Sequence, residues 1–272
     1  MTQKFDPKNS TCVITGGSSG IGEAMAIELL NRGAKKIINI DMKSTDTYKH
    51  EYYECSVSNH DMLDETLKDI ISKHNVDLYH SNAGMCLPDN HEFSIKHWQH
   101  MIDVNFLPHV VAVQNVMPQW LEKNKGHMLI TASTAAFGTL PGSGTYTVTK
   151  SASLSYAEFL AMTYSMHGIG TTVMCPKGVI TGMYNPDNDF NRRIEDMITP
   201  FMTAQQVVTI TLDAMLDKKF MVMTHPNSYG PYAEKGKDIE QWVTQLQDVQ
   251  KNKIEGYNYD EVLTLSKMLT NC

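Results

Sequence analysis

Tyr146 and Lys150 are the residues whose types and spacing point most directly to chemistry. They stand four positions apart in a stretch, 145–167, whose pattern is helical, so both side chains should lie on one helix face. A free tyrosine has a pKa of about 10, and a fixed ammonium beside it would favour the phenolate. Such a pair could take a proton from an alcohol or return one to a ketone. The alternative is an incidental pair on a solvated helix face.

Ser133 and Asn105 are two further polar residues in suggestive places. Ser133 follows a predicted strand over 127–131, at the sheet edge where ligands of parallel sheets bind. Its hydroxyl could stabilise charge that develops on a substrate oxygen, although such a serine can equally be a helix cap. Asn105 falls within a predicted helical stretch, 94–124, where asparagine is unfavourable and where Pro108 favours a kink or break.

A glycine-rich turn, Thr15–Gly22, would position a ligand beside these residues. An apolar run precedes the turn and a helical pattern follows it, and glycine allows the backbone to approach a ligand closely. The new helix N-terminus suits a pyrophosphate. Asp41 ends the next apolar strand, where a carboxylate can accept hydrogen bonds from both ribose hydroxyls of an adenosine. The alternative is an ordinary strand–helix turn.

Strand and helix patterns alternate along most of the chain, which predicts a parallel sheet with helices on both faces. The seven predicted strands are 12–14, 37–40, 52–55, 76–80, 127–131, 170–175 and 220–223. We therefore expect one domain over residues 1–225 and a C-terminal extension over 226–272, with a helix at 239–249. The extension could cap the domain, embrace a neighbouring subunit or help close a pocket.

Composition excludes several classes of function. The 272 residues carry a net charge of -7 without a cluster of basic residues, so a nucleic-acid surface is not expected. No apolar run reaches about 18 residues, so we expect no membrane span. Residues 1–10 lack a secretory signal pattern and the five cysteines are scattered, which favours a reduced, cytoplasmic protein.

Taken together, these motifs resemble the short-chain dehydrogenase/reductase family over roughly residues 10–223. The matching positions are Thr15–Gly22, Asn82, Ala83, Gly84, Asn105, Ser133, Tyr146 and Lys150. The resemblance implies an α/β fold of the Rossmann type, a doubly wound parallel sheet, and an oxidoreductase that uses a nicotinamide cofactor and no metal ion. It also implies a homodimer or homotetramer packed through the two long helical stretches. Residues that could serve such an interface, or equally the core, are Met117, Trp120, Phe159, Met162, Tyr164 and Met166.

The resemblance assigns roles to four catalytic residues. Tyr146 would be the general acid/base, and Lys150 would lower its pKa and hold the nicotinamide ribose. Ser133 would orient the substrate oxygen. Asn105 would hold a water in a proton relay to Lys150.

The resemblance also implies which residues bind the dinucleotide. They are Gly16, Ser18, Ser19, Gly20, Ile21, Asp41, Ser56, Val57, Asn82, Ala83, Gly84, Tyr146, Lys150, Pro176, Val179 and Thr181. Because Asp41 would repel a 2′-phosphate, we expect NAD rather than NADP. Ser56 and Ser81 stand where the family usually has aspartate and asparagine, and Lys177 stands where a small residue is usual. Lys177 either favours an anionic substrate or points to solvent, and lysines are mostly exposed.

The expected substrate pocket is mainly apolar. Its predicted lining is Met85, Leu87, Ser133, Ala135, Phe137, Tyr146, Gly178, Met183 and Tyr184, with the segment 182–200 as a candidate lid. We expect an NAD-dependent enzyme that interconverts a secondary alcohol and a ketone. A catalytically silent NAD-binding or regulatory protein, a reductase that prefers NADPH, and a lyase or epimerase are the alternatives.

Overall fold

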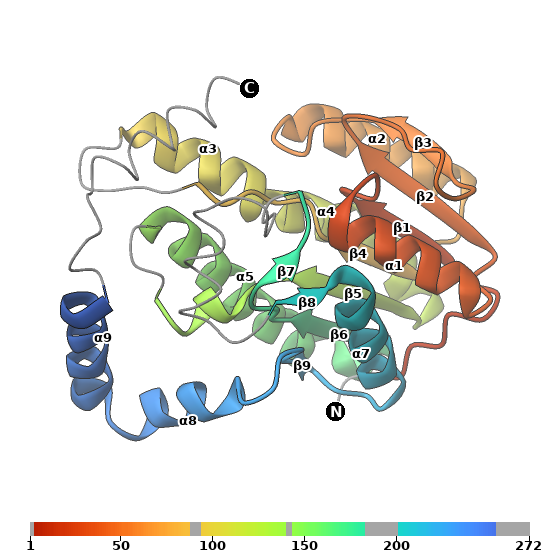
Figure 1. Cartoon of the computed structure of the whole chain (residues 1–272). Coiled ribbons are helices and arrows are strands. Elements are labelled where there is room, and N and C mark those ends of the chain that lie inside the picture. Colours follow the sequence, from red (N-terminus) through yellow and green to blue (C-terminus); the bar gives the residue numbers. More distant parts are fainter. Residues whose placement is uncertain (1–2, 88–93, 140–142, 183–200, 254–272) are drawn as a thin grey trace.

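The centre of the molecule is a seven-stranded parallel sheet with the strand order β3-β2-β1-β4-β5-β6-β9 (Figure 1). The computed structural model describes residues 3–87, 94–139, 143–182 and 201–253. The strands of the sheet are β1 (Thr11–Thr15), β2 (Lys36–Asp41), β3 (Glu51–Glu54), β4 (Leu78–Ser81), β5 (Gly126–Thr131), β6 (Ile169–Met174) and β9 (Met221–Val222). The order reverses between β1 and β4, which confirms the predicted doubly wound, Rossmann-type α/β domain.

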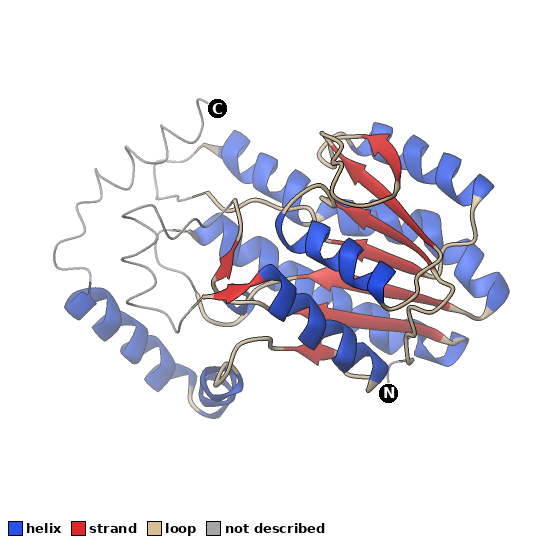
Figure 2. Cartoon of the chain, turned by 45° about the vertical axis from the view of Figure 1, so that its right-hand side comes forward, coloured by secondary structure: helices blue, strands red, loops and turns tan. Residues whose placement is uncertain are grey.

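Helices cover both faces of the sheet, as Figure 2 shows from a second side. The helices are α1 (Gly20–Asn31) and α7 (Ala204–Leu216) on one face, and α2 (His60–Lys73), α4 (Leu107–Lys123) and α5 (Gly144–Tyr164) on the other. Successive residues of a strand point to opposite faces, so Val13 joins one apolar layer while Cys12 and Ile14 join the other. This double burial explains why the strands are continuous apolar runs rather than alternating ones.

The predicted helical stretch 94–124 is broken into α3 (Ile95–Asn105) and α4 at Phe106. Pro108 is the second residue of α4, where its missing N–H would have no helical partner in any case. The break leaves Asn105 as the last residue of α3, fully buried among the elements that form the site. The expected kink is therefore the local feature that turns Asn105 toward the centre of the molecule.

Three short elements were not foreseen from sequence. They are β7 (Val179–Ile180) and β8 (Met202–Thr203), which pair with each other, and α8 (Tyr229–Lys237). The predicted tail helix is α9 (Ile239–Lys253), which follows α8 at the periphery of the molecule (Figure 1). The ring of Tyr232 on α8 packs edge-on against Phe137, with 4.9 Å between the ring centroids.

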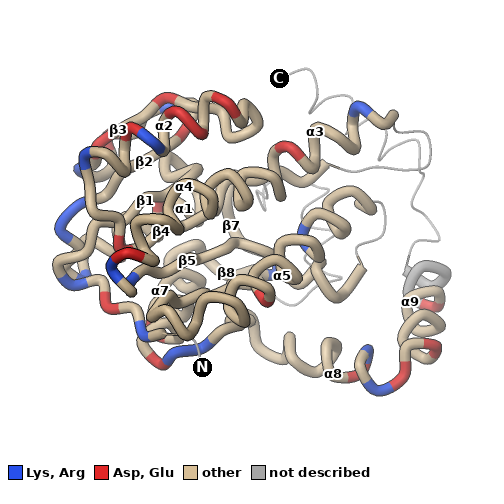
Figure 3. Tube along the Cα trace, turned by 180° about the vertical axis from the view of Figure 1, so that it is seen from behind, with Lys and Arg blue, Asp and Glu red and all other residues tan. Residues whose placement is uncertain are grey.

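Lysine and arginine positions are interspersed with aspartate and glutamate positions along the described chain, as Figure 3 shows. None of the described helices combines the length and the apolar character needed to cross a bilayer. Of the residues considered for a subunit interface, Met117 and Trp120 belong to the core, whereas Phe159, Met162 and Met166 of the α5 region are exposed.

Candidate functional site

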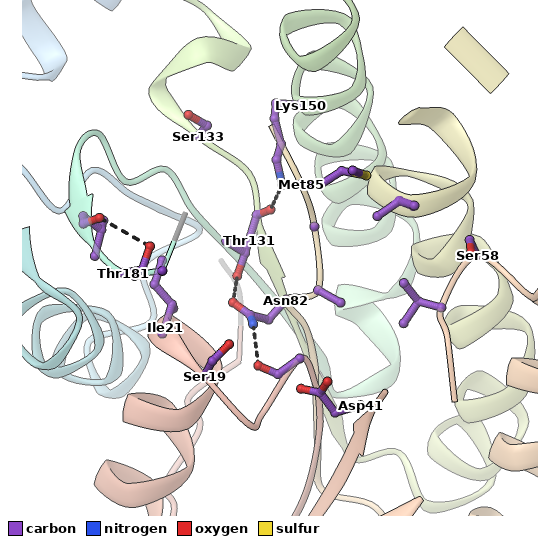
Figure 4. Close-up of a pocket in the computed structure, with 18 of the residues that line it drawn as sticks. Ser19, Ile21, Asp41, Ser58, Asn82, Met85, Thr131, Ser133, Lys150 and Thr181 are labelled. Atoms are coloured by element: carbon purple, nitrogen blue, oxygen red, sulfur yellow. Dashed lines mark hydrogen bonds between the residues drawn. The ribbon is translucent and has the colours of Figure 1, made fainter. Parts of the chain in front are cut away.

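A cavity of about 610 Å³ opens at the carboxyl ends of the strands, where the sheet order reverses (Figure 4). It brings together residues from the turns after β1, β2, β4, β5 and β6. The predicted site residues that line it are Gly16, Ser19, Gly20, Ile21, Asp41, Ser56, Val57, Asn82, Ala83, Gly84, Met85, Ser133, Tyr146, Lys150, Pro176, Val179 and Thr181. The nucleotide-binding motif and the Tyr-Lys pair thus share one cavity.

Several predicted residues lie outside the lining of this cavity. Phe137 and Ala135 are buried and do not line it, and the ring of Phe137 packs against Tyr232, so their assignment as substrate contacts stays a prediction. Leu87, Gly178, Ser18 and Asn105 also do not line it. Met183, Tyr184 and the candidate lid lie outside the described residues. The sequence had indicated which loops surround the site, but not which face of each loop meets the cavity.

The glycine turn has a conformation that side chains would prevent. Gly16 and Gly20 have φ of +69° and +56°, in the region that favours glycine. A Cβ on Gly22 would lie 2.1 Å from the carbonyl oxygen of Gly16, which no side chain permits. Ser19, the N-cap of α1, makes no side-chain capping bond, so the first-turn amides of α1 are not capped by that hydroxyl. This cradle fits the pyrophosphate of a dinucleotide.

Asn39 and Tyr48 hold this turn and were missed by the sequence reasoning. The amide of Gly17 donates to Asn39 Oδ1 at 3.0 Å, and the Tyr48 hydroxyl donates to the carbonyl oxygen of Gly17 at 2.8 Å. Asn39 is fully buried within β2. An asparagine inside an apolar strand is the signal that could have found it, because buried amides need hydrogen-bond partners.

Asp41 lies at the end of β2 and faces the cavity (Figure 4). Its Oδ2 accepts from the amide of Ser18 at 3.0 Å, and its Oδ1 accepts from the amide of Met42 at 2.7 Å. A carboxylate has about four lone-pair positions, so it can also accept from ribose hydroxyls. The hydroxyl of Ser18 donates to the carbonyl oxygen of Lys43 and thereby links the glycine turn to the loop after β2.

Lys150, Thr131 and Asn82 form a row across the centre of the cavity, as Figure 4 shows. Lys150 Nζ donates to the carbonyl oxygen of Thr131 at 2.8 Å, and Thr131 Oγ1 donates to Asn82 Oδ1 at 3.1 Å. Asn82 Nδ2 donates onward to the carbonyl oxygen of Thr15 at 3.1 Å. This row connects the reacting end of the cavity to the glycine turn, and Thr131 was not foreseen in it.

Tyr146 is partly buried and shares a hydrogen bond with the hydroxyl of Ser133. Burial raises the pKa of Tyr146, although the bond to Ser133 offsets part of this change. Burial also lowers the pKa of Lys150 to about 8. The expected lowering of the phenol pKa by Lys150 is therefore wrong for this structure. The ammonium lies 5.6 Å from the centroid of the phenol ring and bonds to a carbonyl instead, while both groups have lost water.

Asn105 uses its side chain to hold the chain after Gly84. Its Oδ1 accepts from the amide of Met85 at 2.8 Å, and its Nδ2 donates to the carbonyl oxygen of Met85 at 2.9 Å. A Cβ on Gly84 would lie 3.1 Å from Asn105 Oδ1, which is a tight contact, and 3.4 Å from Lys150 Nζ, which is an ordinary one, so glycine leaves room here for the Asn105 side chain. The observed role of Asn105 is to fix the cavity wall, and its place in a proton relay stays a prediction.

Lys177 lies in the cavity wall, partly buried, and burial lowers its pKa. Lys177 is therefore partly withdrawn from water, and a preference for an anionic substrate stays a prediction. Its neighbour Pro176 contacts the Ser133 loop, because its carbonyl oxygen accepts from the amide of Thr134 at 3.0 Å and from Ser133 Oγ at 3.4 Å. The loop after β6 is thus joined directly to the serine beside Tyr146.

Two curated proteins show what this chain is similar to. Among curated proteins, a CLA biosynthesis dehydrogenase/reductase of Lactiplantibacillus plantarum is 26% identical over 264 residues, which cover 84% of this chain and 92% of that protein. An uncharacterized oxidoreductase of Staphylococcus aureus is 31% identical over 193 residues, which cover 65% of this chain and 82% of that protein.

Solved structures share the fold. A short chain dehydrogenase/reductase from Burkholderia phymatum in complex with NAD has a TM-score of 0.76 at 24% identity, over 87% of this chain and 96% of that one. A short chain dehydrogenase from Burkholderia cenocepacia in complex with NADP has a TM-score of 0.76 at 17% identity, over 89% and 99%. The family model described as short chain dehydrogenase matches residues 10–192, the part that carries the glycine turn, Ser133, Tyr146 and Lys150. The chain is therefore a member of the short-chain dehydrogenase family of oxidoreductases.

Proposed function

We propose that this protein is an NAD-dependent oxidoreductase that interconverts a secondary alcohol and a ketone on a mainly apolar small molecule. The observation that carries the proposal is the single cavity that joins Asp41 and the glycine turn to Ser133, Tyr146 and Lys150. A dinucleotide held by the first group would present its reactive end to the second. The family provides the chemistry class, and the geometry of these residues supports the roles below.

Tyr146 is the proton donor or acceptor in this proposal. Because its pKa is raised, it is a neutral phenol at neutral pH and can donate a proton to the oxygen of a ketone. In the opposite direction the residue must first lose that proton, and its phenolate then takes the proton of an alcohol. Ser133 bonds to the same hydroxyl and orients the substrate oxygen. Bound nicotinamide supplies the acceptor or donor of hydride.

Lys150 provides a positive charge under the reacting groups. Its ammonium is held by the carbonyl of Thr131, and only 3% of the residue is exposed. With a pKa of about 8, the Lys150 amine is mostly charged at pH 7. An anion that develops on the phenol would raise this pKa and so favour the charged form further. Its distance from the tyrosine ring allows it to act on that anion through space, and hydroxyls of a bound ribose would lie within the same cavity.

Asp41 supports NAD over NADP as the cofactor. Its carboxylate borders the cavity and already accepts hydrogen bonds from three backbone amides, which fixes its direction. A ribose 2′-hydroxyl can donate to it, whereas a 2′-phosphate would meet a like charge. Met85 lines the cavity near Lys150, as Figure 4 shows, and its side chain favours an apolar molecule there.

The experiment is an absorbance assay at the NADH band with purified protein and a panel of secondary alcohols and ketones. We expect turnover with NAD(H), and a loss of turnover in Ser133→Ala with dinucleotide binding retained. Binding without turnover on every substrate would indicate a silent NAD-binding protein. Substrate conversion without net change in NADH would indicate a lyase or epimerase, and faster rates with NADPH would contradict the role given to Asp41.

The assembly and location remain part of the proposal. We propose that the protein acts in the cytoplasm and is a homodimer or homotetramer, and the exposed apolar side chains of the α5 region support the assembly. Phe159, Met162 and Met166 are 47%, 76% and 90% exposed. Light scattering after size exclusion would give a mass that is a multiple of the 30.6 kDa chain, and a monomer would contradict this assignment.

A further inference from the structure

His225 lies just after β9, outside every motif of the sequence, and only 3% of it is exposed. Its ring is bonded on both sides to the loop after β6. The amide of Lys177 donates to His225 Nδ1 at 3.2 Å, and His225 Nε2 lies 2.8 Å from the carbonyl oxygen of Gly178. Because one imidazole contacts two successive residues of the loop, it restrains both the position and the rotation of that backbone.

These contacts define the protonation state of the ring. An amide N–H can only donate, so Nδ1 must carry a lone pair, and a carbonyl oxygen can only accept, so Nε2 must carry the proton. His225 is therefore the neutral Nε2–H tautomer, and Thr224 Oγ1, 3.0 Å from Nδ1, can donate to the same lone pair. Burial lowers the pKa of His225, and so does the charge of Lys177, which agrees with this neutral form.

The loop that His225 holds leads directly to the reacting groups. Pro176 precedes the restrained residues, and its carbonyl oxygen accepts from Ser133 Oγ at 3.4 Å and from the amide of Thr134 at 3.0 Å. Ser133 in turn shares a hydrogen bond with Tyr146. Lys177, whose amide is held by His225, and Val179, which follows Gly178, both line the cavity. A shift of this backbone would therefore move both the cavity wall and the carbonyl that positions Ser133.

We propose that neutral His225 is a positioning residue, which fixes the Pro176–Gly178 backbone and through it the orientation of Ser133 toward the substrate oxygen. The inference rests on the proposed function for its kinetic readout. His225 is not itself among the residues that line the cavity, and it contacts the backbone of Lys177 and Gly178, so its effect is on the placement of the reacting groups rather than on the proton transfer itself.

The kinetic test compares His225→Leu, His225→Gln and the matched control His127→Leu. His127 is another buried histidine, with one ring nitrogen bonded to Thr172 Oγ1, but it lies near the opposite end of β5. A misplacement of about 1 Å can cost on the order of 100-fold in rate, so we expect kcat of His225→Leu to fall at least about tenfold while the dissociation constant for NAD changes less than about threefold. Gln keeps one donor and one acceptor, so it should recover a substantial part of kcat.

The control separates positioning from general stability. His127→Leu also removes a buried hydrogen bond, so both leucine variants should lose stability, which thermal unfolding would measure. Kinetics should be measured at a temperature where all variants are folded. There we expect kcat of His127→Leu to stay within about twofold of that of the original protein, because a modest loss of stability leaves the folded site intact. A kcat of His225→Leu that equals the unmodified value, or an equal loss in His127→Leu, would overturn the proposal.

A second readout does not depend on turnover. Amide hydrogen exchange of the full chain should become faster in His225→Leu for peptides over 175–182 and 132–138, and should stay unchanged there in His127→Leu. If the unmodified protein has no oxidoreductase activity but these peptides respond, the proposed function fails while the positioning role stands. If exchange at 175–182 is unaffected by His225→Leu, the positioning role is refuted whatever the activity.

Discussion

The two ends of the cavity are built in different ways. At the nucleotide end, the glycine turn is held by Asn39, Asp41 and Tyr48, all of which come from the strand and loop that follow α1. At the reacting end, Ser133 and Tyr146 meet Pro176, whose loop depends on His225. These three supports of the glycine turn lie close together in the chain, and Asn82 after β4 adds a further bond to the turn, whereas the reacting end needs segments from most of the second half of the chain. The supports of the glycine turn are therefore the more local part of the site.

The two ends also differ in the state of their ionisable groups. Asp41 is a partly exposed carboxylate with backbone donors around it. The reacting end and the sheet beneath it contain buried groups whose neutral forms are favoured by desolvation, namely Tyr146, Lys150 and His109. The comparison predicts that substitutions at the nucleotide end change affinity, whereas those at the reacting end change turnover.

The largest expected effect is that of Tyr146→Phe. General acid–base catalysis contributes about 10²–10⁴ in rate, so kcat should fall by that factor while NAD binding remains measurable. Stopped-flow or steady-state kinetics with a binding titration would measure both. Tyr156→Phe on the same helix is the matched control, because Tyr156 packs against Phe106 away from the cavity lining. Retained turnover in Tyr146→Phe would remove the proposed role of the phenol.

Acid should destabilise the fold through three buried histidines. Burial lowers the pKa values of His80, His109 and His127 to about 3. Their neutral forms stabilise the fold fully above the unfolded pKa of about 6.5, and this stability is lost as the pH falls toward the folded value. Between these two pKa values, each histidine should lower the free energy of unfolding by about 1.4 kcal/mol for each pH unit of acidification. The three together should lower it by about 4 kcal/mol per pH unit. Urea unfolding between pH 7 and pH 5 would measure the slope, and a flat profile would contradict the assignment.

Asn39→Leu should weaken the nucleotide end. The substitution removes the acceptor of the Gly17 amide at a buried position, a loss of about 1–3 kcal/mol. We expect the dissociation constant for NAD to rise while kcat at saturating NAD stays near its original value, and isothermal titration with kinetics would separate the two. A fall in kcat without a loss of affinity for NAD would contradict the proposed difference between the two ends of the cavity. Asn115→Leu, on α4, is a control for the loss of an asparagine elsewhere.

The smallest expected effect is that of Asp41→Ala on cofactor choice. Removing the carboxylate removes both the acceptor for a ribose hydroxyl and the repulsion of a 2′-phosphate, so the preference for NAD over NADP should narrow by about tenfold or more. Ratios of kcat/KM with the two cofactors would measure it. Asp41→Asn keeps the shape and the acceptor oxygen, and so tests the charge alone. A preference of the unmodified protein for NADP would show that our interpretation of Asp41 is wrong.

Much of the site could be predicted from sequence because its motifs are local. The glycine turn, the apolar strand runs and the four-residue spacing of Tyr146 and Lys150 each depend on short-range geometry, and the structure places them in one cavity. The break at Phe106 was likewise expected from Pro108. What could not be predicted is which way the connecting loops face, as Phe137 illustrates by its contact with Tyr232.

The amino-acid sequence alone determined the doubly wound sheet, the order of its elements and the residues that the chain brings to its carboxyl edge, because hydrophobic period and glycine placement act over a few residues. Only the tertiary structure decided that Asn39 supports the glycine turn, that the carbonyl of Pro176 meets Ser133, and that His225 holds the loop between them. It also decided that the pKa of Tyr146 is raised rather than lowered, because desolvation depends on everything packed around a group and not on its neighbour along a helix.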